Sequence, residues 1–290
     1  MTLAQHSGKT FVITGGSDGI GLECASQLAR SEPDPRIVLV GRDPRRTAAA
    51  VGRLRSESPE CRTDSLLCDF ADQLAVRRLA EDLLRTCPRL DVLVNNAGTV
   101  FSRRTVTPDG VEATFAVNHL AGFLLTELLL ERIRESAPAR IVFTSSEGHY
   151  AGTLDLEDVG FEHGYSIMRA YSRSKLANVL TARHLARRLE DTGVTVTSLH
   201  PGAIATNIWS GAPWFARPVL AIAKRRMEPP AVGGSRLAYL AASPEVEGAT
   251  GGYYDHNRLR DPSRLARDDA LGDRLYAVSA GLVGLAGTTR

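Results

Sequence analysis

Residues 10–21 read Thr-Phe-Val-Ile-Thr-Gly-Gly-Ser-Asp-Gly-Ile-Gly, and this stretch is the strongest indication of the fold class. The apolar run from Thr10 to Thr14 is typical of a buried parallel strand, and it stops at paired glycines. Apolar residues then recur at helical spacing from Ile20 to Arg30. Glycines between a strand and a helix let the backbone approach a phosphate closely, and the helix N-terminus adds aligned N–H groups. The stretch therefore predicts a strand, a phosphate-binding turn and a helix.

Strand-like and helix-like segments alternate along the rest of the chain. Further strands are expected at 36–40, 66–68, 91–94, 140–144, 194–199 and 251–254. Helices are expected at about 45–56, 73–86, 109–135, 167–191 and 233–242. No repeat or low-complexity linker divides the 290 residues. The prediction is one α/β domain over 1–290, built as a single doubly wound parallel sheet (a Rossmann fold) with helices on both faces.

Charge and cysteine content narrow the class of protein. The 35 Lys and Arg residues nearly cancel the 33 Asp and Glu residues, so no global field would draw nucleic acid or an anionic membrane. The basic cluster at 224–226 is interpreted as a solvated loop. Four cysteines lie far apart without metal-ligand spacing, which predicts a reduced, cytoplasmic protein without a metal site.

No segment reads as a membrane anchor. The N-terminus from Met1 to Lys9 lacks an apolar signal core. The longest apolar run, Leu120 to Leu130, is interrupted by Glu127 and is too short to span a bilayer. We therefore expect a protein with neither a membrane nor a nucleic acid as its partner.

The end of the second predicted strand discriminates between dinucleotide cofactors. An acidic residue there would accept the ribose 2′-hydroxyl of NAD, whereas arginine accommodates the 2′-phosphate of NADP. This chain has Arg42 at that point, with Arg45 and Arg46 close behind, which favours NADP(H) over NAD(H). Asp43 is the residue that could reverse this prediction, although it also reads as the N-cap of the next helix.

Tyr171 and Lys175 form the chemical centre of the chain. They are four residues apart in a predicted helix, so both side chains project from one face. A tyrosine pKa of about 10 is too high for easy proton exchange at neutral pH, and a neighbouring ammonium would lower it. Ser146 upstream could hydrogen-bond a carbonyl oxygen and stabilise developing charge, and Ser145 is the alternative donor.

Four motifs together resemble the short-chain dehydrogenase/reductase family, over most of the chain: 14–21, 95–98, Tyr171-x-x-x-Lys175 and Pro201-Gly202. Segments 170–178, 199–202 and 243–254 resemble its retinol-dehydrogenase-like branch. The resemblance implies a catalytic tetrad of Asn118, Ser146, Tyr171 and Lys175, in which Asn118 holds a water that links Lys175 to solvent. It also implies cofactor contacts from the following residues: Gly15, Ser17, Asp18, Gly19, Ile20, Gly21, Arg42, Asp69, Phe70, Asn96, Ala97, Gly98, Tyr171, Lys175, Pro201, Gly202, Ile204 and Thr206.

Two irregular segments are expected to close the crevice beyond the carboxyl ends of the strands, an insertion at about 148–165 and a lid at about 207–230. Trp209, Trp214 and Phe215 in the lid would either form an apolar substrate wall or pack the lid onto the protein body. Thr99 is expected to be a loop residue. His149 or His163 could contact substrate, but each is interpreted as a surface loop residue outside the catalytic set.

These patterns predict an NADP(H)-dependent oxidoreductase that interconverts a lipophilic or aromatic ketone or aldehyde and its alcohol, in a setting such as secondary metabolism. A C=C reductase of the same family is an alternative. A non-catalytic NADPH sensor or scaffold is another, although such a protein would be expected to lose Tyr171 or Lys175. The long helices at 120–135 and 171–188 carry apolar stripes that suit either a homodimer or homotetramer or the protein's own core.

Overall fold

The computed structural model describes residues 8–204 and 227–285, and a single eight-stranded sheet forms its centre. The strand order is β3-β2-β1-β4-β5-β6-β7-β8. The strands are β1 (Thr10–Thr14), β2 (Arg36–Gly41), β3 (Arg62–Leu67), β4 (Val92–Asn95), β5 (Ala139–Thr144), β6 (Val194–His200), β7 (Tyr253–Asp255) and β8 (Arg258–Arg260). Every pairing from β3 to β7 is parallel, and β8 adds an antiparallel edge. The predicted doubly wound fold is confirmed, and β8 is an addition that the sequence did not predict.

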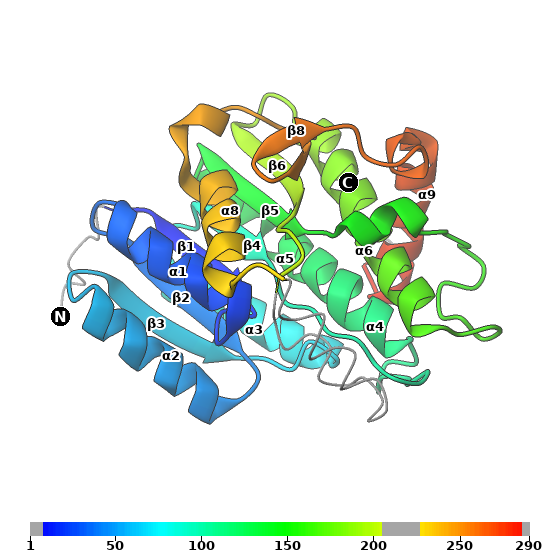
Figure 1. The fold of residues 1–290 in the computed structure, drawn as a ribbon, viewed down its shortest axis with the longest axis horizontal. Coiled ribbons are helices and arrows are strands. Elements are labelled where there is room, and N and C mark those ends of the chain that lie inside the picture. Colours follow the sequence, from blue (N-terminus) through cyan, green and yellow to red (C-terminus); the bar gives the residue numbers. More distant parts are fainter. Residues whose placement is uncertain (1–7, 205–226, 286–290) are drawn as a thin grey trace.

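Helices cover both faces of this sheet (Figure 1). On one face lie α1 (Gly19–Ser31), α2 (Pro44–Glu57) and α8 (Pro230–Ala242). On the other face lie α3 (Gln73–Thr86), α5 (Ala121–Glu135) and α6 (Ile167–Arg188). Successive strand residues point to opposite faces, so Phe11 and Ile13 pack under α1 while Val12 joins the other core. Both faces of the sheet are therefore sealed by apolar contacts.

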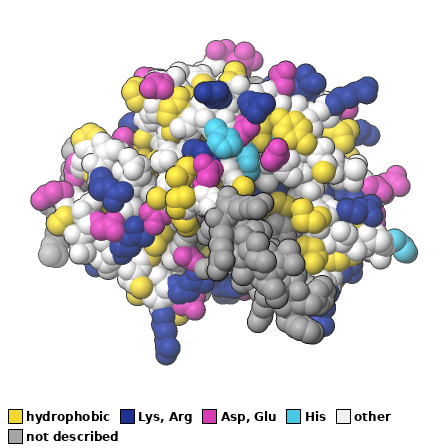
Figure 2. All heavy atoms as spheres, in the orientation of Figure 1, with side chains coloured by type: hydrophobic (Ala, Val, Ile, Leu, Met, Phe, Trp, Pro, Cys, Tyr) yellow, Lys and Arg dark blue, Asp and Glu magenta, His cyan; other side chains and the backbone are white. Residues whose placement is uncertain are grey.

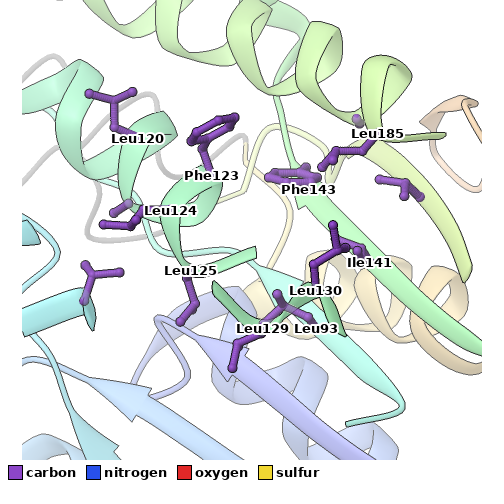
Figure 3. Close-up of a cluster of buried hydrophobic side chains, with 14 of the residues drawn as sticks. Leu93, Leu120, Phe123, Leu124, Leu125, Leu129, Leu130, Ile141, Phe143 and Leu185 are labelled. Atoms are coloured by element: carbon purple, nitrogen blue, oxygen red, sulfur yellow. The ribbon is translucent and has the colours of Figure 1, made fainter. Parts of the chain in front are cut away.

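The larger core lies between the sheet and α5 and α6. Figure 3 shows leucines of α5 and Phe123 packed over Ile141 and Phe143 of β5, with Leu185 of α6 beside them. Each such side chain contributes about 1.5–3 kcal/mol when it is fully buried. This packing fixes the position of α6, which carries Tyr171 and Lys175, against β5.

One continuous helical stretch is long and rich in apolar residues. It comprises α4 (Ala113–Phe115), the π-helical turn η1 (Ala116–Leu120) and α5. By length and composition this stretch, Ala113–Glu135, could cross a membrane, whereas the run Leu120 to Leu130 taken alone is too short. However, 78% of its most apolar window is buried inside the protein, as in the core helix of a soluble domain. The helix is accounted for by the core that it builds.

A C-terminal helix, α9 (Asp269–Leu282), packs against α6 and was not predicted. Its fully buried positions are Leu271, Gly272, Leu275 and Ser279, so its apolar stripe is too thin to be recognised from sequence. Asp269 forms an ion pair with Arg187 of α6 at 2.7 Å. The helix thus covers part of the α6 face that was expected to serve oligomer contacts, and a homo-oligomer stays a prediction.

On the face drawn in Figure 2, basic and acidic side chains are interspersed rather than gathered by sign. This distribution matches the near balance of 35 basic and 33 acidic residues. Mixed charge of this kind does not produce the single-sign potential that steers a polyanion to a surface.

Candidate active site

A cleft of about 690 Å³ opens at the carboxyl ends of the parallel strands. It begins where β1 and β4 lie side by side, which is the point where the strand order reverses and where open α/β sheets bind ligands. Residues from the glycine-rich turn, from β2, from the 96–99 segment, from β5 and from the 200–204 segment line it. The structure therefore brings together motifs that are far apart in the sequence.

Most of the predicted site residues line this cleft. They are Gly15, Ser17, Asp18, Gly19, Ile20, Arg42, Asp69, Phe70, Asn96, Ala97, Gly98, Ser146, Tyr171, Lys175, Pro201, Gly202 and Ile204. Gly21 and Asn118 do not line it. Thr206, the aromatic residues Trp209, Trp214 and Phe215, most of the predicted lid and the basic cluster at 224–226 lie outside the described residues.

The glycine-rich turn has the backbone that phosphate binding requires. Gly15 and Gly19 adopt φ of 66° and 55°, a left-handed conformation that glycine adopts at little cost. Gly21 has a different purpose, because a Cβ there would lie 2.4 Å from the carbonyl oxygen of Gly15. It permits α1 to pack against the turn, and the N-terminus of α1 then opens onto the cleft.

Thr14 ties the turn to the next lining segment. Its hydroxyl donates to the carbonyl oxygen of Val94 at 3.1 Å and accepts from the N–H groups of Asn96 at 2.9 Å and Ala97 at 3.0 Å. The Asn96 side-chain amide donates back to the Thr14 carbonyl at 3.0 Å. These bonds hold the 96–98 backbone along one side of the cleft.

The end of β2 presents arginines to the cleft. Arg42 and Arg46 line it, and Arg46 forms an ion pair with Asp18 of the glycine-rich turn. Asp43 does not line it, because its carboxylate accepts from the N–H of Arg46 at 2.9 Å and caps α2. The N-cap interpretation of Asp43 is confirmed, and the acidic group that could have favoured NAD is committed to the helix.

Tyr171, Lys175 and Ser146 meet at the opposite end of the cleft. The Lys175 nitrogen lies 5.6 Å from the centre of the Tyr171 ring and donates to the carbonyl oxygen of Thr144 at 3.0 Å. The Ser146 hydroxyl hydrogen-bonds Tyr171 and also accepts from the N–H of Gly148 at 3.1 Å. The Ser145 hydroxyl instead donates to the carbonyl oxygen of Lys175 at 2.8 Å, so the geometry favours Ser146 as the group that faces Tyr171.

Burial dominates the protonation of this pair. It raises the pKa of the Tyr171 phenol, an effect partly offset by the hydrogen bond from Ser146. It also lowers the pKa of Lys175 to about 8, because the ammonium is out of contact with water. The shift of the Tyr171 pKa has its causes in burial and in Ser146, so a lowering of this pKa by Lys175 stays a prediction.

Asn118 lies behind the cleft rather than in it. Its side-chain oxygen accepts from the N–H of Thr99 at 2.7 Å, and its amide donates to the Thr99 carbonyl at 3.0 Å and to Ser174 at 3.1 Å. Thr99, expected to be an uninvolved loop residue, lines the cleft and is anchored by Asn118. The water-holding role implied for Asn118 stays a prediction.

The chain matches the model of a known protein family over most of its length. The family model described as short chain dehydrogenase matches residues 9–213, more than half of the chain. The chain belongs to the short-chain dehydrogenase family.

Individual relatives place this dehydrogenase in the retinol-dehydrogenase-like branch. It is 40% identical to retinol dehydrogenase 14 of Mus musculus, over 96% of this chain and 86% of that protein. It is 42% identical to a Streptomyces sp. (strain C5) protein provisionally named daunorubicin C-13 ketoreductase DnrU, over 96% and 93% of the two chains.

Solved structures agree with the fold. An uncharacterized protein from Mycobacterium Paratuberculosis superposes with a TM-score of 0.73 at 30% identity, over 95% of this chain and 93% of that one. A short chain dehydrogenase from Burkholderia cenocepacia, solved in complex with NADP, superposes with a TM-score of 0.67 at 26% identity, over 85% and 95%.

The insertion of this dehydrogenase is held away from the cleft. Among residues 148–165 only Gly148 lines it. The Arg173 guanidinium lies 3.5 Å from the centre of the Phe161 ring and donates to the Thr153 carbonyl at 3.1 Å, which pins the insertion to α6. Within the described residues, the insertion therefore does not form the expected wall of the crevice.

The prediction that His149 is a surface loop residue is wrong. It lies in the short helix η2 (Glu147–Ala151) and is fully buried, with its ring 4.6 Å from that of Tyr253. One ring nitrogen lies 2.7 Å from the Ser146 carbonyl, and the other accepts from the N–H of Ser263 at 3.1 Å. It braces the loop that carries Ser146. His163, by contrast, is exposed as expected.

Four residues that the sequence patterns did not predict also line the dehydrogenase's cleft. They are Glu147, Met168, His200 and Met227. Met168 is three residues before Tyr171 on α6, so helical spacing was a usable signal for it. His200 directly precedes Pro201-Gly202, and burial lowers its pKa, so its ring is favoured in the neutral form.

Proposed function

We propose that this chain is an NADP(H)-dependent oxidoreductase that interconverts a lipophilic or aromatic ketone or aldehyde and the corresponding alcohol. The observation that carries the proposal is the meeting of Tyr171, Lys175 and Ser146 at one end of a cleft lined at its other end by a glycine-rich turn and two arginines. Membership of the short-chain dehydrogenase family supports an oxidoreductase. The names of the relatives, retinol dehydrogenase and ketoreductase, support a carbonyl/alcohol pair as substrate.

The residues present fit a dinucleotide. The left-handed turn at Gly15 and Gly19 bares backbone N–H groups at the start of α1, where a pyrophosphate is favoured. Arg42, which follows β2, and Arg46, in the first turn of α2, would bind the additional phosphate of NADP. Pro201, Gly202 and Ile204 would hold the nicotinamide end. When bound, the cofactor supplies or accepts the hydride, and the protein's own residues handle the proton.

Proton transfer to the substrate oxygen is assigned to Tyr171. Because burial raises its pKa, the phenol keeps its proton at neutral pH and can donate it to the carbonyl oxygen during reduction. Ser146 hydrogen-bonds the same oxygen and stabilises the charge that develops on it. The Lys175 ammonium lies 5.6 Å from the Tyr171 ring and stabilises the phenolate that remains.

Apolar side chains in the cleft support a lipophilic substrate. Met168 lies three residues before Tyr171 on α6 and lines the cleft, as do Ile204 and Met227. Met168 is 52% exposed, and a bound apolar molecule would cover this surface. Binding pockets for small apolar ligands combine such surface with a few polar groups, here Ser146 and Tyr171.

The test is turnover by the purified protein with NADPH, measured by cofactor absorbance against retinal, aromatic ketones, aliphatic ketones and α,β-unsaturated ketones. Reduction of the carbonyl in lipophilic members, confirmed by product analysis, is the expected result. Products saturated at C=C with the carbonyl intact would replace this proposal with the C=C reductase. NADPH binding without consumption across the whole set would favour the sensor or scaffold.

A further inference from the structure

Asn178 is buried one helical turn beyond Lys175 on α6. Its side-chain amide donates to the carbonyl oxygens of Asn118 at 3.0 Å and Thr144 at 3.1 Å. The Thr144 carbonyl is also the acceptor of the Lys175 ammonium, at 3.0 Å. Two acceptors on one side of the amide fix which atom is the nitrogen. Asn178 therefore touches the backbone of one tetrad residue and shares an acceptor with another.

His119 continues this contact toward the C-terminal helix. One ring nitrogen, Nδ1, lies 3.3 Å from the Asn178 oxygen, and the other, Nε2, lies 3.0 Å from the hydroxyl of Ser279 in α9. The Asn178 oxygen can only accept, so Nδ1 carries the proton. Burial lowers the pKa of His119 to about 4, so the ring is neutral and Nε2 accepts from Ser279. All hydrogen bonds then point the same way, from Ser279 through His119 and Asn178 to the two carbonyls.

We propose that Asn178, His119 and Ser279 form a chain of positioning residues that makes α9 part of the active site by setting the place of Lys175 and Asn118. The inference rests on the proposed function. Two features support it. Each member is buried, and the chain ends on the carbonyl that accepts from Lys175.

The helix α9 lies outside the segment that the family model matches. The short-chain dehydrogenase model matches residues 9–213, whereas α9 spans Asp269–Leu282. The general family pattern therefore does not include the helix from which the chain starts. His119 and Asn118 are neighbours in the π-helical turn at 116–120. His119 contacts Ser279 of α9, whereas Asn118 contacts Thr99.

Three variants of the full chain separate positioning from packing. Ser279→Ala removes the first donor and leaves everything near the cleft unchanged. Asn178→Asp keeps the shape and the acceptor, but its carboxylate cannot donate to either carbonyl oxygen. Asp273→Ala is the matched control, because it loosens α9 from His184 and Arg187 at the surface without touching the chain. For each variant, the rate of single-turnover reduction and the thermal unfolding are measured with NADPH bound. The affinity for NADPH is measured by titration.

The expected results differ for each variant. A misplacement of the proton-transfer group should slow the chemical step of Asn178→Asp by about 100-fold, with little change in NADPH affinity. Loss of one neutral hydrogen bond should slow Ser279→Ala by a factor of about 5. Asp273→Ala should keep the wild-type rate although it melts earlier. Equal rates in Ser279→Ala and Asp273→Ala would overturn the proposal and reduce the chain to packing.

A readout that needs no turnover keeps the inference separate from the proposed function. In ¹⁵N NMR of the wild type, His119 should carry its proton on Nδ1. The ammonium of Lys175 should titrate about 1 pH unit higher in Asn178→Asp, because a carboxylate replaces the amide beside it. A proton on Nε2 of His119, or an unmoved Lys175 midpoint, would refute the chain. If no carbonyl is reduced but both NMR results hold, the proposed function fails and the chain stands.

Discussion

The ammonium of Lys175 donates a hydrogen bond to the backbone carbonyl of Thr144 at 3.0 Å. Thr144 is the last residue of β5, so this bond joins the helix that carries Tyr171 to the carboxyl end of a central strand. Both groups are buried, which makes the bond stronger than the same contact in water. The lysine therefore has a structural partner as well as its proposed place beside the phenol.

Tyr171→Phe should slow carbonyl reduction by about 10²–10⁴-fold, because it removes the proton donor and leaves the ring in place. NADPH affinity should remain close to that of the wild type, as measured by fluorescence titration. Tyr150→Phe is the matched control, since the Tyr150 hydroxyl bonds the Asp261 carbonyl outside the cleft. A Tyr171→Phe enzyme with wild-type rates would show that another group donates the proton.

Arg42→Ala should weaken NADPH binding by about 10–100-fold, the range expected for loss of a hydrogen bond to a charged group, and should change NADH binding little. Arg45→Ala serves as control, because Arg45 is exposed and does not line the cleft. Both dissociation constants are measured for each variant. Equal weakening of NADPH and NADH in Arg42→Ala would contradict the preference for NADP(H).

The rate of reduction should fall as the pH rises above about 8. Burial lowers the pKa of Lys175 to about 8, so the ammonium loses its proton there and can no longer stabilise the phenolate of Tyr171. The raised pKa of Tyr171 keeps the phenol protonated over the same interval. The check is the pH profile of the single-turnover rate with saturating NADPH. A profile that stays flat to pH 10 would separate the lysine's charge from catalysis.

Gly21→Ala should destabilise the protein by several kcal/mol, because the new methyl group would lie 2.4 Å from the Gly15 carbonyl oxygen and force α1 away from the turn. NADPH binding should weaken with it. Gly52→Ala in α2 is a matched control with no atom within 4 Å of the new methyl group, and it should stabilise the protein by about 0.5–1 kcal/mol. Chemical denaturation of both variants measures the two effects, and equal changes would refute the close-packing role of Gly21.

Local patterns were enough to predict the architecture and most of the cleft. The run from Thr10 to Gly21 contains the signals for a strand, a turn and the start of a helix, and the structure has each of these elements at the predicted residues. Tyr171 and Lys175 share a face because helical spacing alone dictates it. Asp43 was recognisable as an N-cap from its position before Pro44, and its bond to the Arg46 N–H confirms it.

Long-range contacts were beyond the reach of such patterns. His149 resembles any polar loop residue until β7 and Ser263 close over it, more than a hundred residues later. Thr99 gains its place from Asn118, and the insertion is drawn off the cleft by Arg173 and Phe161. Each of these outcomes depends on which surfaces meet after the sheet has formed.

Local sequence patterns were sufficient to predict the doubly wound sheet, the glycine-rich turn and the shared face of Tyr171 and Lys175, because the periodicities of strands and helices can be recognised over a few residues. The tertiary structure decided the burial that raises the pKa of Tyr171 and lowers the pKa of Lys175. It also decided that Ser279, 160 residues from His119, reaches the support of Lys175. Desolvation and hydrogen bonding between distant segments exist only after the chain has packed, which is why periodicity could not reveal them.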